Sequence, residues 1–171
     1  LTKTVLPVVD QYATKTQIMS DVAAVAAQID ALKKRGDVRG AYDTVKAAVV
    51  AAGEAAHVEL LWRYARACYD LCNESVDPAE KKAFAEEGDR QSAAGVEAKE
   101  DHLEAQRWRG VCLGTLGGFV PAKEKIANAF VIKKHFTRAA ELDPTDAGAH
   151  HCLGKWCWSV LQITFIERGF A

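Results

Sequence analysis

The part of the sequence that decides the fold is residues 136–154, FTRAAELDPTDAGAHHCLG. Phe136 and Ala139 lie about one helical turn apart, on the same side of a helix. That helix must end before Pro144, because a proline disfavours the helical conformation in the residue that precedes it. Asp146 follows closely, and aspartate is one of the residue types that cap a new helix. The stretch therefore predicts two helices joined by a tight turn.

These residues match the tetratricopeptide (TPR) repeat, which places W-x2-L-G-x2-Y on one helix and A-x3-F…P on the next. Counted on from Pro144, the Leu-Gly positions of the following repeat are occupied by Leu153 and Gly154. Trp62 and Trp108 fall in earlier Trp positions, although their separation exceeds the usual period of about 34 residues. We therefore predict an all-α, TPR-like α-solenoid of antiparallel helix pairs. The alternative is an unrelated helical bundle.

Helix-ending residues divide the chain into about seven helices. The divisions fall at Gly36-Asp37, Gly53, Asp77-Pro78, before Asp101, at Gly117-Gly118 and at Asp143-Pro144. Residues 1–15 contain Pro7 and show no helical apolar stripe, so we predict an extended N-terminal arm, with Ser20 as a candidate cap for the first helix. We assign residues 16–171 to one TPR-like helical domain that is truncated at its C-terminal end.

Composition and motifs argue against several classes of protein. The chain has 171 residues and a net charge of −1, so binding of nucleic acid by bulk charge is not expected. It lacks the phosphate-loop, dinucleotide, nucleophile-elbow and H-E-x-x-H motifs, so we expect no enzyme and no cofactor. No apolar run reaches the length of a membrane span.

Five cysteines are spread through the helical sequence. They are Cys68, Cys72, Cys112, Cys152 and Cys157. Their spacings do not form the C-x2-C pairs typical of zinc sites, so we expect no metal. We predict buried free thiols in a reducing compartment, because free cysteine is among the most buried residue types.

A basic column is predicted on the concave face of the array, where the first helices of TPR pairs line a groove. The residue after each Trp position points into this groove. The predicted peptide-binding residues are Arg63, Arg66, Arg109, His151 and Lys155. Arginine binds carboxylates with a planar fork of donors, so the column favours an acidic, extended ligand. The alternative is that the arginines pair with acids of the same chain, such as Glu59.

A second basic cluster lies on the predicted helix over residues 121–142. It consists of Lys123, Lys125, Lys133, Lys134 and Arg138. Lys133, Lys134 and Arg138 share much of one face of this helix by their spacing. We name them as a secondary basic patch. The alternative is an ordinary solvated outer face.

Several runs of the sequence resemble the regulator of microtubule dynamics family. They are KIANAFVIKKHF at residues 125–136, AAELDP at 139–144, LGKWC at 153–157 and LLWRYARA at 60–67. The resemblance implies a TPR-like domain without catalysis that associates with microtubules and spindle poles. Some relatives are anchored to mitochondrial or endoplasmic-reticulum membranes, which would require segments absent from this sequence.

The predicted function is an interaction module of the microtubule cytoskeleton, in the cytoplasm and at the spindle in cell division. Its partner is expected to be tubulin, through an acidic tail, or another acidic protein segment. A lipid-binding or membrane-contact-site module is the alternative. In the family, further helices follow the seventh. We therefore expect the last helix to expose Trp156, Trp158, Leu161 or Phe165 and to favour self-association.

Overall fold

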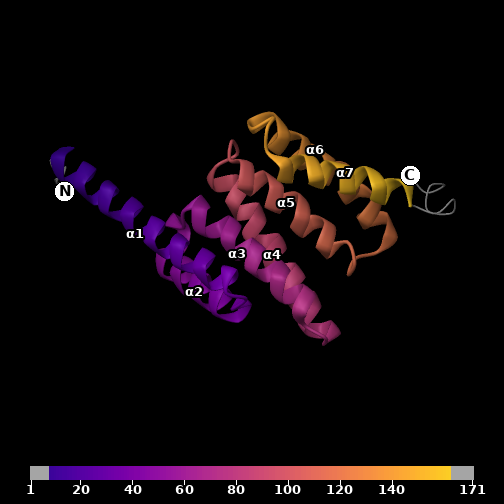
Figure 1. Ribbon diagram of the computed structural model, residues 1–171, viewed down its shortest axis with the longest axis horizontal. Coiled ribbons are helices and arrows are strands. Elements are labelled where there is room, and N and C mark those ends of the chain that lie inside the picture. Colours follow the sequence, from indigo (N-terminus) through magenta and orange to yellow (C-terminus); the bar gives the residue numbers. More distant parts are fainter. Residues whose placement is uncertain (1–7, 163–171) are drawn as a thin grey trace, which may run out of the picture.

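The computed structural model describes the backbone of residues 8–162 and the side chains of Gln17 and residues 19–162. In that range the chain forms seven α-helices and no strand (Figure 1). The helices are α1 (Val8–Lys34), α2 (Val38–Ala52), α3 (Val58–Glu74), α4 (Pro78–Ala98), α5 (Leu103–Leu116), α6 (Ala122–Leu142) and α7 (Ala147–Leu161), with the 3-10 turn η1 (Gly53–Ala55) before α3. None of the described helices is long and apolar enough to cross a membrane. The prediction of an all-α chain with seven helices is confirmed.

Three predicted helix starts are confirmed by their capping contacts. The Asp37 carboxylate accepts the backbone N–H of Gly40 at 2.8 Å, at the start of α2. Asp77 caps α4, whose first residue is Pro78. Asp146 accepts the backbone N–H of Ala149 at 2.6 Å and caps α7. These carboxylates satisfy N–H groups that have no partner within their own helix.

The predicted N-terminal arm differs from the structure. Helix α1 begins at Val8, so residues 8–15 are helical, and Ser20 lies inside the helix instead of capping it. The N-terminal half of α1 runs beyond the other helices (Figure 1). A helix nucleated by packing of its C-terminal half can extend further at little cost, and it needs no apolar stripe to do so. Residues 1–7 of the predicted arm lie outside the described part of the chain.

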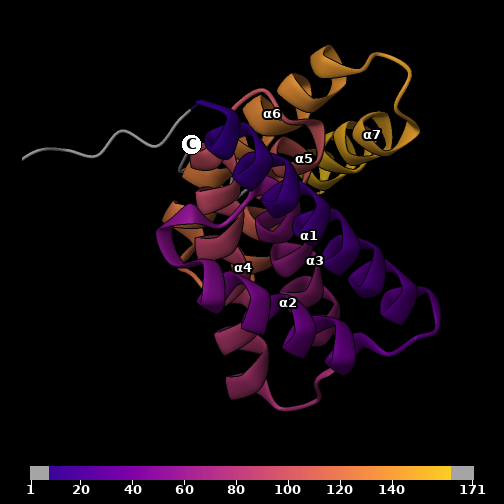
Figure 2. The same ribbon diagram turned by 90° about the vertical axis from the view of Figure 1, so that its left-hand side faces the viewer.

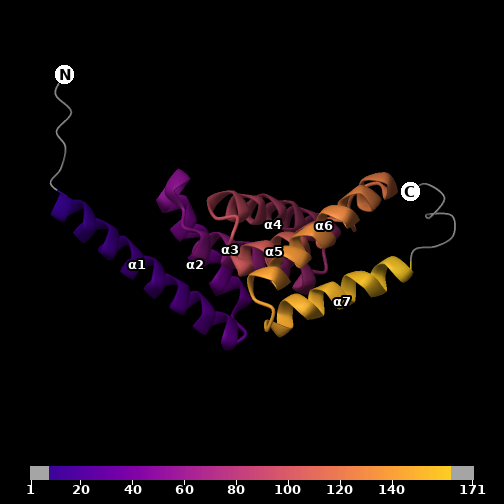
Figure 3. The same ribbon diagram turned by 90° about the horizontal axis from the view of Figure 1, so that it is seen from above.

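Successive helices pack as antiparallel pairs, with the most extensive packing between α3 and α4 and between α5 and α6. The first helices of the pairs also meet one another, because α3 contacts α1 and α5, and α5 contacts α7. Figure 2 shows α1 lying beside α2 and α3. Seen from above, α1 and α7 lie on one side of the array, and α4 and α6 lie on the other (Figure 3). We call the side formed by α1, α3, α5 and α7 the first-helix face.

A polar and aromatic cluster joins α2, α3 and α4 in the core. The rings of Tyr42 and Tyr64 meet edge to face at 5.6 Å, and those of Tyr42 and Phe84 at 5.5 Å. Both tyrosine hydroxyls donate to the carboxylate of Glu87, at 2.7 and 2.5 Å. Burial alone would raise the pKa of Glu87, but these hydrogen bonds and the nearby Lys46 lower it. The half-buried carboxylate therefore stays ionised, and each of its oxygens accepts a hydrogen bond from one tyrosine.

Two glycines allow neighbouring helices to approach closely. A Cβ atom on Gly110 of α5 would lie 2.3 Å from the ring of Phe136 in α6, and one on Gly88 of α4 would lie 3.2 Å from Cys68 Cβ in α3. Phe136 is itself buried, so its ring has little room to move away. Gly154, which occupies the glycine position of the TPR pattern, makes no such approach, because nothing lies within 4 Å of a Cβ built there.

The prediction of five buried thiols is only partly confirmed. Cys68, Cys72 and Cys112 are buried free thiols, Cys152 is half-buried, and Cys157 is exposed. Burial raises the pKa of Cys112 to about 12, which keeps the thiol protonated and unreactive. For Cys157 the prediction of burial is wrong, because among the described helices α7 packs mainly against α5 and α6, and Cys157 is exposed.

We predict that Gly110→Ala lowers the free energy of unfolding by about 1–3 kcal/mol, because the added methyl group overpacks the Phe136 contact. Gly154→Ala is the matched control. It adds the same methyl group to a helix at an open position, so it should leave stability unchanged or raise it by up to about 1 kcal/mol. Urea unfolding followed by circular dichroism measures both variants. Equal effects of the two substitutions would contradict the close packing of α5 on α6.

Candidate functional site

The first turns of α3 and α5 are built alike on the first-helix face. His57 precedes α3, and its Nδ1 accepts the backbone N–H of Glu59 at 3.2 Å. His102 precedes α5, and its Nδ1 accepts the backbone N–H of Ala105 at 3.3 Å. Both imidazoles therefore act as helix caps. The sequence did not reveal this role, because histidine is not among the preferred capping residues.

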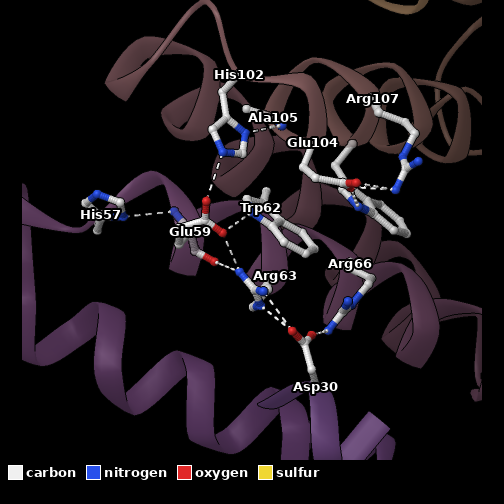
Figure 4. Close-up of polar contacts among 11 residues, drawn as sticks. Asp30, His57, Glu59, Trp62, Arg63, Arg66, His102, Glu104, Ala105 and Arg107 are labelled. Atoms are coloured by element: carbon white, nitrogen blue, oxygen red, sulfur yellow. Dashed lines mark hydrogen bonds and ion pairs between the residues drawn. The ribbon is translucent and has the colours of Figure 1, made fainter. Parts of the chain in front are cut away.

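A glutamate in each of these first turns accepts a hydrogen bond from the tryptophan of the same helix. Trp62 Nε1 donates to Glu59 at 3.0 Å (Figure 4). Trp108 Nε1 donates to Glu104 at 3.1 Å. A buried indole N–H needs such an acceptor. The two tryptophans of the TPR pattern are thus fixed by carboxylates that the pattern itself does not include.

Arg63 lies between two carboxylates from different helices. It donates to Asp30 of α1 at 2.7 Å and to Glu59 of α3 at 2.6 Å. Arg66 donates to the second oxygen of Asp30 at 2.6 Å. The guanidinium of Arg63 also stacks over the Trp62 ring, 4.0 Å from its centroid. These contacts, drawn in Figure 4, tie α1 to α3 and leave the side chain of Arg63 only 12% exposed.

The carboxylates of this network are held in their ionised form. Partial burial would raise the pKa of Glu59, but hydrogen bonds from Arg63, His102 and Trp62 lower it to about 2. His102 Nε2 lies 3.0 Å from the second oxygen of Glu59, so the network continues from α3 to the start of α5. Partial burial would also raise the pKa of Asp30, but the hydrogen bonds from Arg63 and Arg66 lower it.

Arg109 and Arg107 join α5 to its neighbours. Arg109 points toward α4, where it donates to the Asp89 carboxylate at 2.6 Å and to the Ser92 hydroxyl at 3.2 Å. Arg107 donates to Glu104 and to Asp146, the residue that caps α7. The predicted ligand-binding residues Arg63, Arg66 and Arg109 thus pair with acids of the same chain, as the sequence left open.

The remaining two residues of the predicted column lie in a pocket between α5, α6 and α7. The pocket has a volume of about 640 Å³, and both His151 and Lys155 of α7 line it. Lys125 of α6 lines it as well, and it was not among the predicted ligand-binding residues. Its apolar lining includes Trp108, Leu113, Ile126, Ile132, Phe136 and Trp156. We call this cavity the α5–α7 pocket.

The charges around the α5–α7 pocket are of one sign. Among the described residues that line it there are two lysines and one histidine, but no aspartate or glutamate. Lys125 and Lys155 are exposed, and neither forms an ion pair with a described residue. The pocket can therefore attract an anionic group that enters an apolar cavity.

The structure brings the residues of the secondary basic patch together. Lys133, Lys134 and Arg138 all line a second hollow of about 570 Å³ beside the end of α4. Arg138 is paired with Asp101 and Glu141, and the ammonium of Lys133 lies 5.3 Å from the centroid of the Trp156 ring. Glu100 and Glu141 also line this hollow, so its charge is mixed.

Helix α7 exposes part of the apolar surface expected from the sequence. Trp158 and Leu161 are each 66% exposed. Trp156 is half-buried instead, and its indole N–H donates to the backbone oxygen of Ala129 at 2.8 Å. Phe165 lies outside the described residues. Self-association through this surface stays a prediction.

Solved structures place the fold in the class of TPR domains. The first TPR domain of human RPAP3 superposes with a TM-score of 0.59 at 17% identity, over 82% of this chain and 92% of that one. The first TPR of Spaghetti, bound to an HSP90 peptide, also gives 0.59 at 16% identity, over 82% of this chain and 96% of that one. At such low identity these matches define the fold. The chain is thus a TPR-like helical domain.

Sequence comparison then identifies the family. The profile described as "Regulator of microtubule dynamics protein 1-3" matches residues 25–171. Regulator of microtubule dynamics protein 1 of Bos taurus is 34% identical over 152 residues, and that of Mus musculus is 34% identical over 151 residues. Each alignment covers 88% of this chain, but only 47% and 48% of the relatives, so the chain spans about half their length. The chain belongs to the regulator of microtubule dynamics family.

We predict that Glu59→Gln lowers the free energy of unfolding by about 1–2 kcal/mol at pH 7. The amide weakens the charge-assisted hydrogen bonds from Arg63 and His102, and partial exposure of Glu59 limits the loss. Chemical denaturation followed by circular dichroism measures the change. Glu54→Gln in the exposed η1 turn is the control and should leave stability unchanged.

The stability lost in Glu59→Gln should become smaller as the pH falls. The pKa of Glu59 is about 2 in the folded chain, against an ordinary value of 4.5. A lowered pKa stabilises the folded chain fully above pH 4.5, and this contribution fades as the pH falls toward 2. The difference between the wild type and Glu59→Gln should therefore shrink over that interval. A difference that stays constant from pH 7 to pH 2.5 would contradict the ionised network.

Proposed function

We propose that this chain is a non-catalytic interaction module that binds an acidic protein segment in the α5–α7 pocket. The observation that carries the proposal is the lining of the pocket, in which Lys125, His151 and Lys155 surround an apolar cavity without any carboxylate among the described lining residues. A cavity with charges of one sign favours a ligand of the opposite sign. An acidic peptide meets this requirement.

The comparisons support a peptide as the ligand. Two of the TPR domains with a similar fold are described as bound to the HSP90 peptide SRMEEVD and the HSP70 peptide SGPTIEEVD, which carry acidic residues near their ends. The family name supports a partner on microtubules. The glutamate-rich tail of tubulin is therefore the candidate that we propose, with action at cytoplasmic and spindle microtubules.

The distribution of charge explains why binding falls at one end of the first-helix face. Arg63, Arg66 and Arg109 are compensated by Asp30, Glu59 and Asp89 within the chain, so they offer little net charge to a ligand. Lys125 and Lys155 keep their charge available. The chain as a whole is close to neutral, and attraction of an acidic ligand must come from such a local site.

The double variant Lys125→Glu/Lys155→Glu should weaken binding of the chain to microtubules by at least about tenfold, because two attractive contacts are replaced by repulsive ones. It reverses two charges at the pocket while leaving the ion pairs of α1, α3 and α4 intact. Co-sedimentation with intact microtubules and with microtubules stripped of their acidic tails measures the effect across a salt series. Wild-type binding should require the tails and weaken as salt increases.

Lys82→Glu/Lys123→Glu is the matched control, because it makes the same change of net charge at exposed positions outside the pocket. Binding that is lost equally in the two double variants would show a general effect of charge and contradict a site at the α5–α7 pocket. Pelleting that is unchanged in Lys125→Glu/Lys155→Glu would also contradict it. Circular dichroism confirms that both variants remain helical.

The apolar lining of the same pocket favours a second candidate, an acyl chain with an anionic head group. Leu113, Ile126 and Ile132 offer an apolar environment, and the volume of about 640 Å³ lies in the range of small-molecule sites. Native mass spectrometry of the purified chain distinguishes the two functions. A bound lipid that an acidic peptide does not displace would support this candidate over the peptide.

A further inference from the structure

The α5–α7 pocket is divided between exposed basic residues and buried apolar ones. Lys125, His151 and Lys155 are exposed members of its lining, whereas Leu113 and Phe136 are buried. Ile126, Ile132 and Trp156 are half-buried. The positive charge therefore lies at the edge of the pocket, and the interior offers apolar surface.

The two kinds of surface contribute unequally to binding. A solvent-exposed ion pair changes an affinity by a factor of about five at most. Burial of a leucine-sized side chain in an apolar cavity changes an affinity by about ten- to a hundredfold. Exposed charges at Lys125 and Lys155 can therefore attract and orient an acidic segment, but most of its affinity must come from a side chain inside the cavity.

We propose that the α5–α7 pocket selects acidic segments that carry one large apolar residue between their carboxylates. The apolar side chain fills the cavity beside Leu113 and Ile132, and the flanking carboxylates contact Lys125 and Lys155. A segment made of glutamates alone can make only the second kind of contact. This inference rests on the proposed function and adds to it the class of peptide that the site accepts.

Gly114 of α5 offers a way to fill the cavity without disturbing its charges. It lines the pocket, and a Cβ built on it meets only Ile132 Cδ1, at 3.9 Å. The variant Gly114→Leu therefore adds a side chain to the pocket without a clash at its Cβ position. Gly154→Leu is the matched control, because Gly154 is a helical glycine at an open position outside the pocket.

Fluorescence anisotropy with three labelled heptapeptides tests the proposal. The first has leucine at the centre of six glutamates, the second has alanine at the centre, and the third keeps leucine but replaces the glutamates by glutamines. The leucine peptide should bind at least about tenfold more tightly than the alanine peptide. Gly114→Leu should remove this difference without weakening the alanine peptide, and Gly154→Leu should preserve it.

A thiol-labelling measurement locates the bound side chain. Cys152 lines the pocket and is half-buried, whereas Cys157 of the same helix is exposed and lies outside the pocket. The leucine peptide should slow maleimide labelling of Cys152 several-fold while leaving Cys157 unchanged, as measured by mass spectrometry. Equal rates at Cys152 with and without the bound peptide would overturn the proposed location.

The outcomes separate this inference from the function on which it rests. Equal affinities for the leucine and alanine peptides, unaffected by Gly114→Leu, would overturn the apolar anchor and leave the proposed function standing. Equal affinities for the leucine peptide and its glutamine analogue would overturn the need for acid, and with it both proposals. Binding of none of the three peptides would overturn both as well.

Discussion

The two ion pairs of Arg63, with Asp30 and with Glu59, determine which basic residues of the first-helix face keep their charge available. They link α1 to α3 and bring a basic residue of the predicted groove into contact with two acids. Breaking one such pair leaves the other partner partly buried without its counter-charge, which costs more than the pair itself gains. The arginines at this end of the face are therefore structural groups whose charge is compensated within the chain.

At the α5–α7 pocket, the basic residues Lys125 and Lys155 form no ion pair with a described residue. Helix α7 meets α5 only sparsely, and Arg107 reaches across to Asp146 at the start of α7. Further along α7, Lys155 faces the cavity opposite apolar residues of α5 and α6. The same array thus has ion pairs across one end of the first-helix face and a pocket lined by Lys125 and Lys155 at the other. This division accounts for a local basic site in a chain of nearly neutral charge.

Much of the fold could be predicted from the sequence, because caps and helix-ending residues act locally. Asp37, Asp77 and Asp146 mark true helix starts. The start of α1 at Val8 could not be found in this way, since that segment has no apolar periodicity. The exposure of Cys157 depends on which helices flank α7, and a cysteine in a helical sequence carries no signal of that kind.

The candidate site was only half predictable for a related reason. His151 and Lys155, chosen from their spacing, both line one cavity, because they lie about one turn apart on the same helix. Spacing could not show that Asp30, more than thirty residues earlier, meets Arg63 and Arg66. The sequence assigns Lys125 to an outer basic cluster, and only the packing of α6 against α5 and α7 reveals that it lines the pocket.

The most direct test of this account is an NMR titration of the chain with an acidic, leucine-containing peptide. The account predicts shifts in the amides of α5–α7 and unchanged Nε–H signals of Arg63 and Arg109. Shifts centred on those arginine signals and on α3 would contradict it.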